Sequence, residues 1–260
     1  MSECSKDNER SLPLVSIITV VYNNARFIKN SIQSVLSQNY ARLEYVVIDG
    51  GSTDGTLDVI EKYREKISVF TSEADGGIYD ALNKGVSLAT GNIIGFLHSD
   101  DIFADKSVVS KIANHFEKTN ADIIYGDLDY VRKDDLNFVV RHWRSGKYIS
   151  SALGNGWIPP HPTFYARRDL YKKYGGFDIS YKISADYDCM IRFLKEKDVR
   201  VSYIPEVLVK MRTGGMSNNR PINTIKKLYE DYLILNKNQV GGVKSLILKK
   251  IRKISQYFVR

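Results

Sequence analysis

Two adjacent carboxylic acids, Asp100 and Asp101, follow the apolar run at residues 93–97. That run has the length and composition of a buried strand. Each negative charge raises the cost of ionising the other, so the pair is best tolerated where a cation binds. Magnesium and manganese bind through one or two carboxylates together with the phosphate oxygens of a substrate. The pair therefore indicates a site for Mn²⁺ or Mg²⁺ on a phosphorylated substrate.

Two other apolar runs end in polar residues in the same way. Tyr22-Asn23-Asn24 ends the first run, and Asp49, followed by Gly-Gly-Ser-Thr-Asp-Gly, ends the second. Taken alone, Asp49 is better explained as a turn or helix-capping residue, because strand-to-helix turns require Asp, Ser, Thr and Gly. Acidic residues at two strand ends shift the balance toward a cation site.

The elements that must position these residues alternate between strands and helices. Apolar runs of strand length are separated by segments with apolar residues at helical spacing. Strands are expected at 14–21, 44–48, 67–71, 92–97 and 122–125, and helices at 26–38, from about 52–54, at 77–89 and at 106–118. This alternation predicts an α/β fold, with a mostly parallel central sheet, helices on both faces and ligands at the carboxyl ends of the strands.

Two motifs that hold nucleotide phosphates through backbone N–H groups are absent. The sequence has no G-x-G-x-x-G after the first strand and no G-x-x-x-x-G-K-[ST]. It therefore lacks both a dinucleotide-binding fingerprint and a P-loop. We expect a metal ion to hold the phosphate instead.

Three segments carry a family resemblance: PLVSIITVVYNNARFIKNSIQSVLSQNY, EYVVIDGGSTDGTLDVI and SEADGGIYDALNKGVSLATGNIIGFLHSDD, in this order. Together they resemble the family 2 glycosyltransferases of the GT-A fold, most closely the branch that assembles bacterial surface polysaccharides such as O-antigen and capsule. The resemblance covers about residues 13 to 218, and the three motifs together are far more specific than any one alone. It implies transfer of a hexosyl or N-acetylhexosaminyl group from a nucleotide-diphosphate donor to a glycan hydroxyl, with inversion.

The resemblance gives several residues a role in binding the donor. It places Tyr22 and Asn23 near the nucleotide base and Asp49 near the base or ribose. It places Asp75 and Asn83 in the wall of the donor pocket.

The resemblance also identifies the acidic pair with the metal motif of the family. Asp100 and Asp101 stand at this motif, and Asp101 is expected to be the direct ligand of Mn²⁺ or Mg²⁺ on the diphosphate. Family members often carry a second acid after the one at Asp49, where it reaches the base, and this chain has Gly50 there. Uridine diphosphate is the expected nucleotide because the family uses it most.

Transfer also needs a base, because an acceptor hydroxyl is a poor nucleophile at neutral pH. The stretch KISADYDCMIRFL offers Asp186 and Asp188 at the start of a predicted helix. Both acids also suit the positive end of the helix dipole, which is the better explanation for an arbitrary helix. The resemblance places the catalytic base at Asp186. Asp188 is expected to be a capping or supporting residue, or a contact to acceptor or phosphate.

His161 is the other candidate on the acceptor side. It lies between Pro160 and Pro162, which present it rigidly. Two roles are equally supported: a structural hydrogen-bonding residue, and a contact to the acceptor or to phosphate.

Composition places the chain among ordinary globular proteins. Of its 260 residues, 43% are apolar and 26% are charged. No apolar window is long enough to span a bilayer, and the start MSECSKDNERSLP has no apolar signal-peptide core. Cys4 and Cys189 have neither metal-ligand nor disulfide spacing. We expect a cytoplasmic protein.

The positive charge is concentrated at the end of the chain. Residues 221–260 contain nine Lys or Arg against Glu230 and Asp231, which accounts for seven of the eight net positive charges. The nearly neutral body argues against nucleic-acid binding. One helix is expected at 222–236. A second follows Gly241-Gly242, and its apolar face and basic remainder consist of Ile247, Ile251, Ile254 and Phe258, and of Lys249, Lys250, Arg252 and Lys253.

Two roles for this second helix are about equally supported: packing on its own domain, and binding an anionic membrane surface. Acceptors carried on a lipid diphosphate, which the resemblance implies, favour the membrane and a peripheral location at the cytoplasmic face of the inner membrane. We therefore expect three regions: a polar leader at 1–12, a GT-A domain at 13–220 and a basic helical extension at 221–260. The donor half of the domain is expected at 13–101 and the acceptor half at 102–220.

Two other functions are weaker alternatives. A sugar nucleotidyltransferase would need a glycine-rich phosphate loop with basic residues after the first strand, where this chain has Tyr22-Asn23-Asn24-Ala25. A non-catalytic module that binds sugars or nucleotides would not need Asp101 and Asp186 together.

Overall fold

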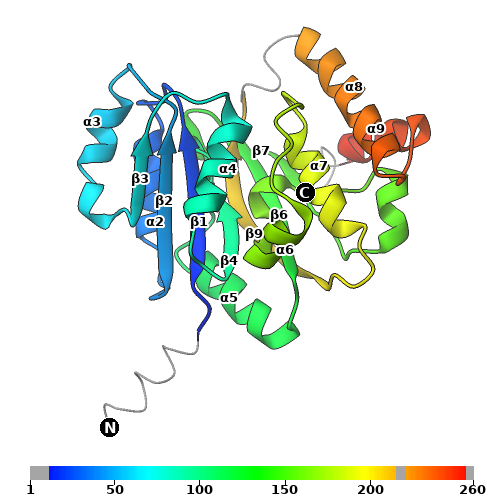
Figure 1. The fold of residues 1–260 in the computed structure, drawn as a ribbon, viewed down its shortest axis with the longest axis horizontal. Coiled ribbons are helices and arrows are strands. Elements are labelled where there is room, and N and C mark those ends of the chain that lie inside the picture. Colours follow the sequence, from blue (N-terminus) through cyan, green and yellow to red (C-terminus); the bar gives the residue numbers. More distant parts are fainter. Residues whose placement is uncertain (1–11, 215–220, 256–260) are drawn as a thin grey trace.

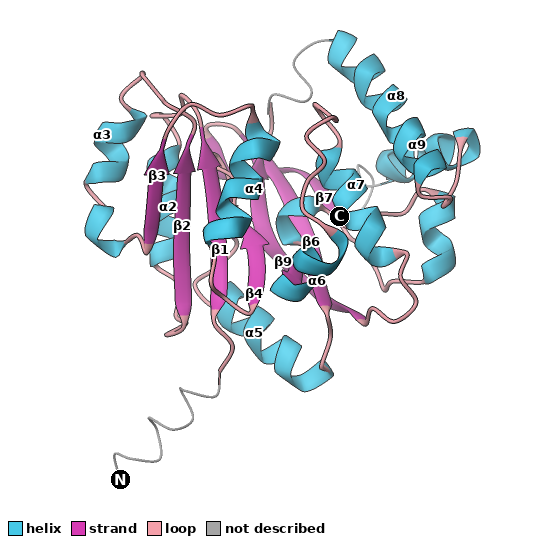
Figure 2. Cartoon of the chain, in the orientation of Figure 1, coloured by secondary structure: helices cyan, strands magenta, loops and turns pink. Residues whose placement is uncertain are grey.

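The computed structural model of the chain describes residues 12–214 and 221–255. A single sheet runs through it in the order β3-β2-β1-β4-β8-β6-β9-β5, and β7 pairs with β6 (Figures 1 and 2). The polar leader expected at 1–12 lies outside the described residues except for Leu12.

The first half of the chain builds the parallel part of the sheet. Strands β1, β2, β3 and β4 are mutually parallel neighbours. The short strand β5 pairs with β9 in antiparallel orientation. The elements of this half are β1 (Val15–Val21), α2 (Ile28–Leu36), β2 (Leu43–Asp49), α3 (Thr56–Glu61), a 3-10 turn (Arg64–Lys66), β3 (Val69–Ser72), α4 (Ile78–Leu88), β4 (Ile93–Phe96), β5 (Ile102–Phe103) and α5 (Val108–Thr119).

The second half extends the sheet and adds the C-terminal helices. Strand β8 lies between β4 and β6 and is antiparallel to both, so β6 runs in the same direction as β4. The elements are β6 (Ile123–Arg132), β7 (Asp135–Trp143), 3-10 turns at Ser150–Asn155 and His161–Thr163, β8 (Tyr165–Arg167), α6 (Arg168–Tyr174), α7 (Ala185–Leu194), β9 (Val201–Arg212), α8 (Pro221–Lys237) and α9 (Val243–Ser255).

Two apolar layers cover the faces of the sheet. Buried residues of α2 and α5, such as Ile32 and Ile112, pack on one face. Buried residues of α4, α7 and α8, such as Leu82, Phe193 and Leu235, pack on the other. The burial of strand β1 on both faces explains why its sequence is continuously apolar rather than alternating. The α/β fold with helices on both faces is confirmed.

The predicted strand at 122–125 is much longer in the structure. β6 continues to Arg132 because β7 folds back on it as a hairpin and β9 pairs with it in parallel. The hairpin therefore extends from the carboxyl end of β6, at the edge where β1 and β4 also end. Helices α8 and α9 lie beside α7 (Figure 1). The division of the chain at residue 220 stays a prediction.

Candidate functional site

The loops after β1, β2 and β4 are tied together by hydrogen bonds at one edge of the sheet. The Asn24 side chain donates to Oγ of Ser99 at 2.8 Å, and the Asn24 backbone N–H donates to Oγ1 of Thr56 at 2.9 Å. The Asn23 backbone N–H donates to Oγ of Ser52 at 2.8 Å. The strand-end residues predicted from the sequence are thus brought to a common edge.

Asp49 is a fully buried carboxylate with one unused oxygen. Its Oδ2 accepts hydrogen bonds from the N–H groups of Gly51 and Ser52 and from the hydroxyl of Ser72, at 3.0, 2.9 and 2.8 Å. Its Oδ1 is buried and has no hydrogen-bond partner among the described residues. A buried carboxylate oxygen without a donor is costly. It is accounted for if a ligand N–H or O–H group donates to it.

Gly50 provides space for another carboxylate. A Cβ on Gly50 would lie 2.5 Å from Oδ2 of Asp75, which is far closer than two such atoms approach. The other oxygen of Asp75 accepts from the Gly77 N–H at 2.8 Å. Asp75 therefore occupies the position that a side chain after Asp49 would take, and this explains why the sequence has glycine there.

Tyr22 and Asn23 lie at the open end of β1. The Tyr22 side chain is 64% exposed, so its ring is available for stacking. Asn23 has a left-handed backbone with φ of 48°, and its Oδ1 accepts from the Thr53 N–H at 2.8 Å. Asn is among the residues that adopt this conformation most readily, and here it joins the loops after β1 and β2.

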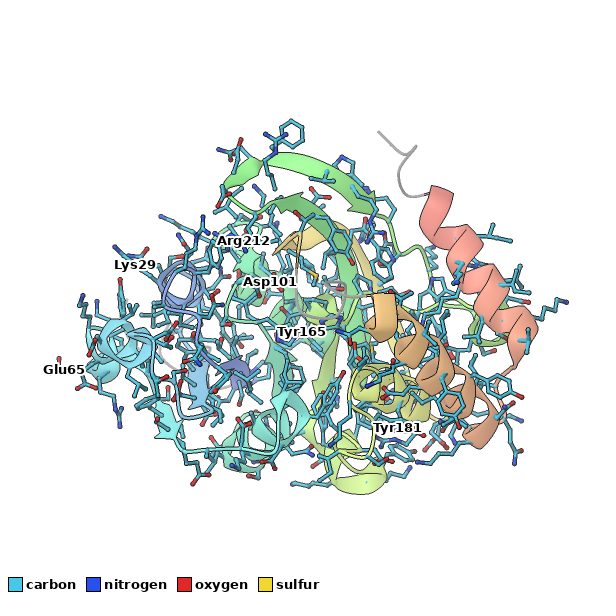
Figure 3. The ribbon with its side chains drawn as sticks, turned by 90° about the horizontal axis from the view of Figure 1, so that it is seen from above. Lys29, Glu65, Asp101, Tyr165, Tyr181 and Arg212 are labelled. Atoms are coloured by element: carbon cyan, nitrogen blue, oxygen red, sulfur yellow. The ribbon has the colours of Figure 1, made fainter. Side chains whose placement is uncertain are left out.

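The two acids of the adjacent pair have different surroundings. Asp100 is half-buried, whereas Asp101 is fully buried below Arg212 (Figure 3). Oδ1 of Asp101 accepts from the Arg212 N–H at 3.3 Å, and its Oδ2 has no hydrogen-bond partner among the described residues. Burial and the neighbouring Asp100 raise the pKa of Asp101 well above its usual value. Asp101 is therefore the buried acid of the pair and Asp100 the more accessible one, and the role of Asp101 as the direct metal ligand stays a prediction.

Arg212, the last residue of β9, contacts both members of this pair. Its guanidinium donates to the Asp100 backbone carbonyl and, at 3.1 Å, to that of Lys133 in the β6–β7 turn. The guanidinium also lies 4.8 Å from the centre of the Phe27 ring. One arginine thus joins the loop after β4 to the hairpin and to the start of α2.

The residues around Asp100 suit a hard cation that is shared with a substrate. In the described part of the chain, no three His, Cys, Asp or Glu side chains are grouped closely enough to form a protein metal cage. Mg²⁺ and Mn²⁺ do not need such a cage, because substrate phosphates and water complete their shell. One accessible carboxylate, Asp100, fits that mode of binding.

Asp186 is linked to the loop after β4 through two histidines. Nδ1 of His161 lies 3.4 Å from Oδ2 of Asp186, and Nε2 of His161 lies 3.1 Å from Nε2 of His98. His98 is two residues before Asp100. The side chains of Asp186 and His161 are 23% and 33% exposed, so a ligand can reach both. The acidic loop and the predicted base are therefore neighbours in space.

The protonation states of this group follow from burial and charge. Burial lowers the pKa of His161 to about 4, so this ring is neutral at neutral pH. Burial alone would raise the pKa of Asp186, but His161, Lys227 and a backbone N–H together hold it below its usual value. Since His161 is neutral at pH 7, the positive charges that act there are those of Lys227 and Lys249. Asp186 is therefore an ionised carboxylate at neutral pH.

Tyr79 fixes the other side of Asp186. Its hydroxyl lies 2.6 Å from the Ile183 carbonyl and 3.2 Å from Oδ1 of Asp186, so one proton serves two acceptors. Burial and Asp186 raise the pKa of Tyr79, so the hydroxyl stays protonated. Its ring stacks on Phe177 with centroids 5.9 Å apart, which holds the hydroxyl in place.

Two predicted contact residues have structural partners instead. The Asn83 amide donates to the Phe177 carbonyl and accepts from the Phe177 N–H, both at 2.8 Å, so it joins α4 to the loop before α7. Asp188 is fully buried and pairs with Nε of Arg192 at 2.7 Å and with the Asn238 amide at 3.2 Å. The polar groups of both residues are thus used inside the protein, and the expected places of Asn83 in the donor pocket and of Asp188 at acceptor or phosphate stay predictions.

Several residues of the site were missed in the sequence. His98 stands beside the acidic pair and could have been noted for its position alone. Tyr79, Arg212 and Lys227 carry no such signal, because each reaches the site from a helix or strand far away in the sequence.

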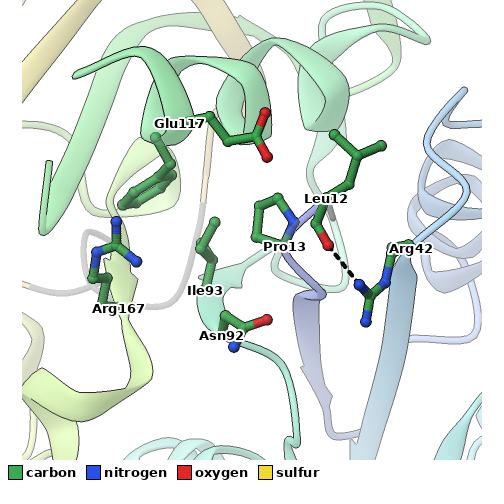
Figure 4. Close-up of a pocket in the computed structure, with 8 residues that line it drawn as sticks. Leu12, Pro13, Arg42, Asn92, Ile93, Glu117 and Arg167 are labelled. Atoms are coloured by element: carbon green, nitrogen blue, oxygen red, sulfur yellow. Dashed lines mark hydrogen bonds between the residues drawn. The ribbon is translucent and has the colours of Figure 1, made fainter. Parts of the chain in front are cut away.

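A pocket of about 320 Å³ lies at the opposite end of the sheet (Figure 4). It is at the amino ends of β1 and β4, where Nη1 of Arg42 donates to the Leu12 carbonyl at 2.7 Å. The residues that line it are Leu12, Pro13, Arg42, Asn92, Ile93, Phe116, Glu117 and Arg167. Ligands of parallel sheets bind at the carboxyl ends of strands, so this pocket is separate from the candidate site.

The sequence of the chain is similar to known glycosyltransferases. It is 32% identical over 191 residues to an uncharacterized glycosyltransferase of Mycobacterium tuberculosis, covering 70% of this chain and 69% of that one. It is 31% identical over 211 residues to a PGL/p-HBAD biosynthesis glycosyltransferase of Mycobacterium bovis, covering 79% and 80%.

Solved structures share the fold at lower identity. A mannosyltransferase of Pyrobaculum calidifontis, in complex with GDP-Man and Mn²⁺, has a TM-score of 0.67 at 19% identity and covers 96% of this chain and 70% of its own. S. aureus TarS 1-349 in complex with UDP-GlcNAc has a TM-score of 0.66 at 19% identity, with 94% and 72% covered. The model of the family described as "Glycosyl transferase family 2" matches residues 16–184. The chain is therefore a glycosyltransferase of family 2, with the GT-A fold.

Proposed function

We propose that the protein transfers a sugar from a nucleoside diphosphate donor, favoured as a UDP-sugar, to a hydroxyl of a glycan acceptor in surface polysaccharide biosynthesis. The observation that carries the proposal is the contact series from Asp186 through His161 to His98. It brings an ionised carboxylate next to the loop that carries the half-buried Asp100. A donor whose diphosphate reaches Asp100 would thus present its anomeric carbon near Asp186.

The nucleoside end of the donor has its own supporting residues. Oδ1 of Asp49 needs a donor group, which a nucleobase N–H or a ribose hydroxyl supplies. Asp75 lies next to Asp49 in the space left by Gly50, and the exposed ring of Tyr22 can stack on a base. Asn23 supports this region indirectly, because its side-chain oxygen accepts the Thr53 N–H and so joins the loops after β1 and β2.

Asp186 serves as the base in a single displacement. The acceptor oxygen bonds to the anomeric carbon while the bond from that carbon to the diphosphate breaks, which inverts the anomeric configuration. The acceptor proton passes to the Asp186 carboxylate, and the nucleoside diphosphate leaves with the bonding electrons. A Mn²⁺ or Mg²⁺ ion held by Asp100 would neutralise charge on the departing diphosphate. His161 and Tyr79 contact the two oxygens of Asp186 and orient it.

The acceptor is proposed to be linked to a lipid, and the C-terminal helices to meet an anionic membrane. Among the residues described, no helix is both long and apolar enough to cross a bilayer. On α9, Val243, Ile247 and Ile251 recur every four residues and are 61%, 55% and 55% exposed. The net charge of these last forty residues favours anionic lipids. The side chains of Ile254 and Phe258 lie outside the described residues.

A second exposed row on α8 strengthens the membrane proposal. Ile225, Tyr229 and Leu233 also recur every four residues and are 64%, 63% and 37% exposed.

One basic residue expected on the solvent face of α9 is placed differently: Lys249 is buried, pairs with Asp231 at 2.8 Å and lies over the Tyr187 ring. α9 thus packs on the domain through one face and exposes an apolar row on another.

A product assay tests the proposal. Purified protein would be incubated with Mn²⁺, either UDP-sugars or GDP-sugars, and lipid-linked or short soluble glycans. Release of nucleoside diphosphate that depends on the acceptor is the expected result. Release of pyrophosphate from a nucleoside triphosphate and a sugar phosphate would show a nucleotidyltransferase instead. Donor binding without any release across the acceptor panel would support a binding module.

A further inference from the structure

The loop that leads into α7 is held by a carboxylate from α8. Oε1 of Glu230 accepts the Lys182 N–H, and Oε2 accepts the N–H groups of Ile183 and Ser184, all at 2.9 Å. Successive backbone N–H groups of this kind form a concave site for an anion. Asp186 follows two residues later, as the second residue of α7.

The N–H groups before α7 are not capped by the side chain of the loop residue at the N-cap position. Ser184 is the N-cap residue of α7, but its side chain makes no capping hydrogen bond. Its hydroxyl lies 3.5 Å from Nζ of Lys227 on α8 instead. The conformation of the loop therefore depends on a helix almost fifty residues further along the chain, since Glu230 is separated from Ser184 by 46 positions.

The hairpin of α8 and α9 also contacts the residues after Asp186. Nζ of Lys249 lies 3.3 Å from the centre of the Tyr187 ring, and Lys249 pairs with Asp231 beside Glu230. The Asn238 amide donates to Asp188 at 3.2 Å. α8 and α9 thus hold the segment on both sides of Asp186, while Asp186 itself stays partly exposed.

We propose that Glu230 is a positioning residue for sugar transfer: it fixes the backbone at residues 182–184 so that Asp186 points at the acceptor hydroxyl. The inference rests on the proposed function, because it assumes that Asp186 is the base. A displacement of about 1 Å at a reacting group can reduce the rate on the order of a hundredfold. Loss of part of the Glu230 contact should therefore affect the chemical step more than donor binding.

Glu230→Gln is the informative substitution. It keeps the length of the side chain, but its NH₂ group cannot accept a hydrogen bond, so at least one of the three N–H groups loses its partner. We expect kcat to fall about tenfold or more, with the donor KM and the donor Kd within about twofold of wild type. Glu230→Asp, which keeps both oxygens, should recover part of kcat. A Tm close to that of wild type and donor binding measured by titration with UDP would show that the variants are folded.

Lys237→Gln is the matched control on the same helix. Lys237 joins α8 to Asp178 at 3.0 Å, in the first part of the same loop, and is not one of the acceptors of the N–H groups of residues 182–184. Its loss removes a partly exposed ion pair between α8 and this loop, and kcat should stay within about twofold of wild type. An equal loss of kcat in Lys237→Gln and Glu230→Gln would overturn the proposal, because general loosening of α8 would then explain both.

A double-mutant cycle separates this inference from the proposed function. If Glu230 acts through Asp186, adding Glu230→Gln to Asp186→Asn lowers the residual kcat no further. Multiplicative losses would overturn the positioning role and leave Asp186 as the base. Wild-type kcat in Glu230→Gln, with Asp186→Asn inactive, would also overturn the positioning role alone. Full activity of Asp186→Asn would overturn Asp186 as the base, whereas the proposed function fails only if the wild type releases no nucleoside diphosphate in an acceptor-dependent way.

Discussion

Two adjacent acids can differ in burial, as the pair after β4 does. The sequence indicates that Asp100 and Asp101 lie at a strand end, and they do. Which acid faces outward depends on the turn between β4 and β5 and on Arg212, which arrives from β9. Those contacts join residues more than one hundred positions apart, so no local pattern could reveal them. Tyr79 was missed for the same physical reason, because it contacts Asp186 from 107 positions earlier in the chain.

The first prediction separates the two acids. Asp100→Asn should abolish the part of donor affinity that depends on Mn²⁺, because the accessible carboxylate is lost. Asp101→Asn should retain it, because a buried carboxyl with a raised pKa resembles an amide in size and charge. Calorimetric titration of UDP with and without Mn²⁺ measures both. The reverse outcome would restore Asp101 as the direct ligand.

Stability provides a second readout for Asp101. The pKa of Asp101 is raised in the folded state. Its ionisation therefore has no effect on the free energy of unfolding below about pH 4, and lowers that free energy as the pH rises toward the folded-state pKa. Asp101→Asn lacks this loss. The Tm of the variant minus that of wild type, in metal-free buffer, should therefore increase from pH 4 to pH 8. A difference that does not change with pH would contradict the burial of an ionisable Asp101.

The second prediction concerns Gly50. Gly50→Ala should push the Asp75 carboxylate out of its position, because the added Cβ would lie 2.5 Å from Oδ2. Donor affinity should fall severalfold in Gly50→Ala and in Asp75→Ala, and the double variant should lose no more than either. Additive losses would show that Gly50 and Asp75 act separately. The Tm of all three should change little, because the carboxylate can move toward solvent.

At the scale of elements, the alternation of strands and helices could be predicted from the sequence, whereas the packing of the C-terminal helices could not. The first four strands and their helices follow from apolar runs and helical spacing, and their bounds in the structure lie within a few residues of those predicted. α9 was correctly expected to be an amphipathic helix. Its Lys249, however, turns inward to Asp231, because a buried acid on α8 needs a partner.

The third prediction tests this buried pair. Lys249→Met keeps the aliphatic stem but leaves Asp231 buried without its cation, which should cost about 3 kcal/mol or more of unfolding free energy. Denaturant titration measures this value. Asp231→Asn added to Lys249→Met should recover a large part of it, since no charge is then left unpaired. A loss below about 1 kcal/mol would indicate a pair exposed to solvent.

At the scale of the whole molecule, the net positive charge is concentrated in one part of the sequence. Seven of eight net positive charges lie in the last forty residues, and the described part of that segment, residues 221–255, contains α8 and α9 beside α7 (Figure 1). The matched family residues end at 184, before this hairpin begins. The sequence showed its charge and amphipathic pattern, but Glu230, which reaches back to residues 182–184, is visible only in the fold.

The fourth prediction concerns membrane binding. The protein should co-sediment with anionic vesicles and not with neutral ones, and high salt should weaken this binding because the attraction is screened. Ile247→Ser with Ile251→Ser should greatly reduce it while leaving transfer to a soluble acceptor unchanged. Phe138→Ser with Val140→Ser on β7 is the matched control, since these side chains are 47% and 44% exposed. Equal loss in both pairs would assign binding to general surface hydrophobicity.

The most direct test of the account is the turnover of Asp186→Asn with a donor and acceptor that the wild type uses. The substitution keeps size and polarity but cannot take the acceptor proton. Release of nucleoside diphosphate should fall about a hundredfold or more, while the donor Kd measured in the presence of Mn²⁺ stays within about twofold of wild type. Wild-type turnover, or an equal loss of turnover and donor affinity, would contradict the assignment of Asp186 as the base.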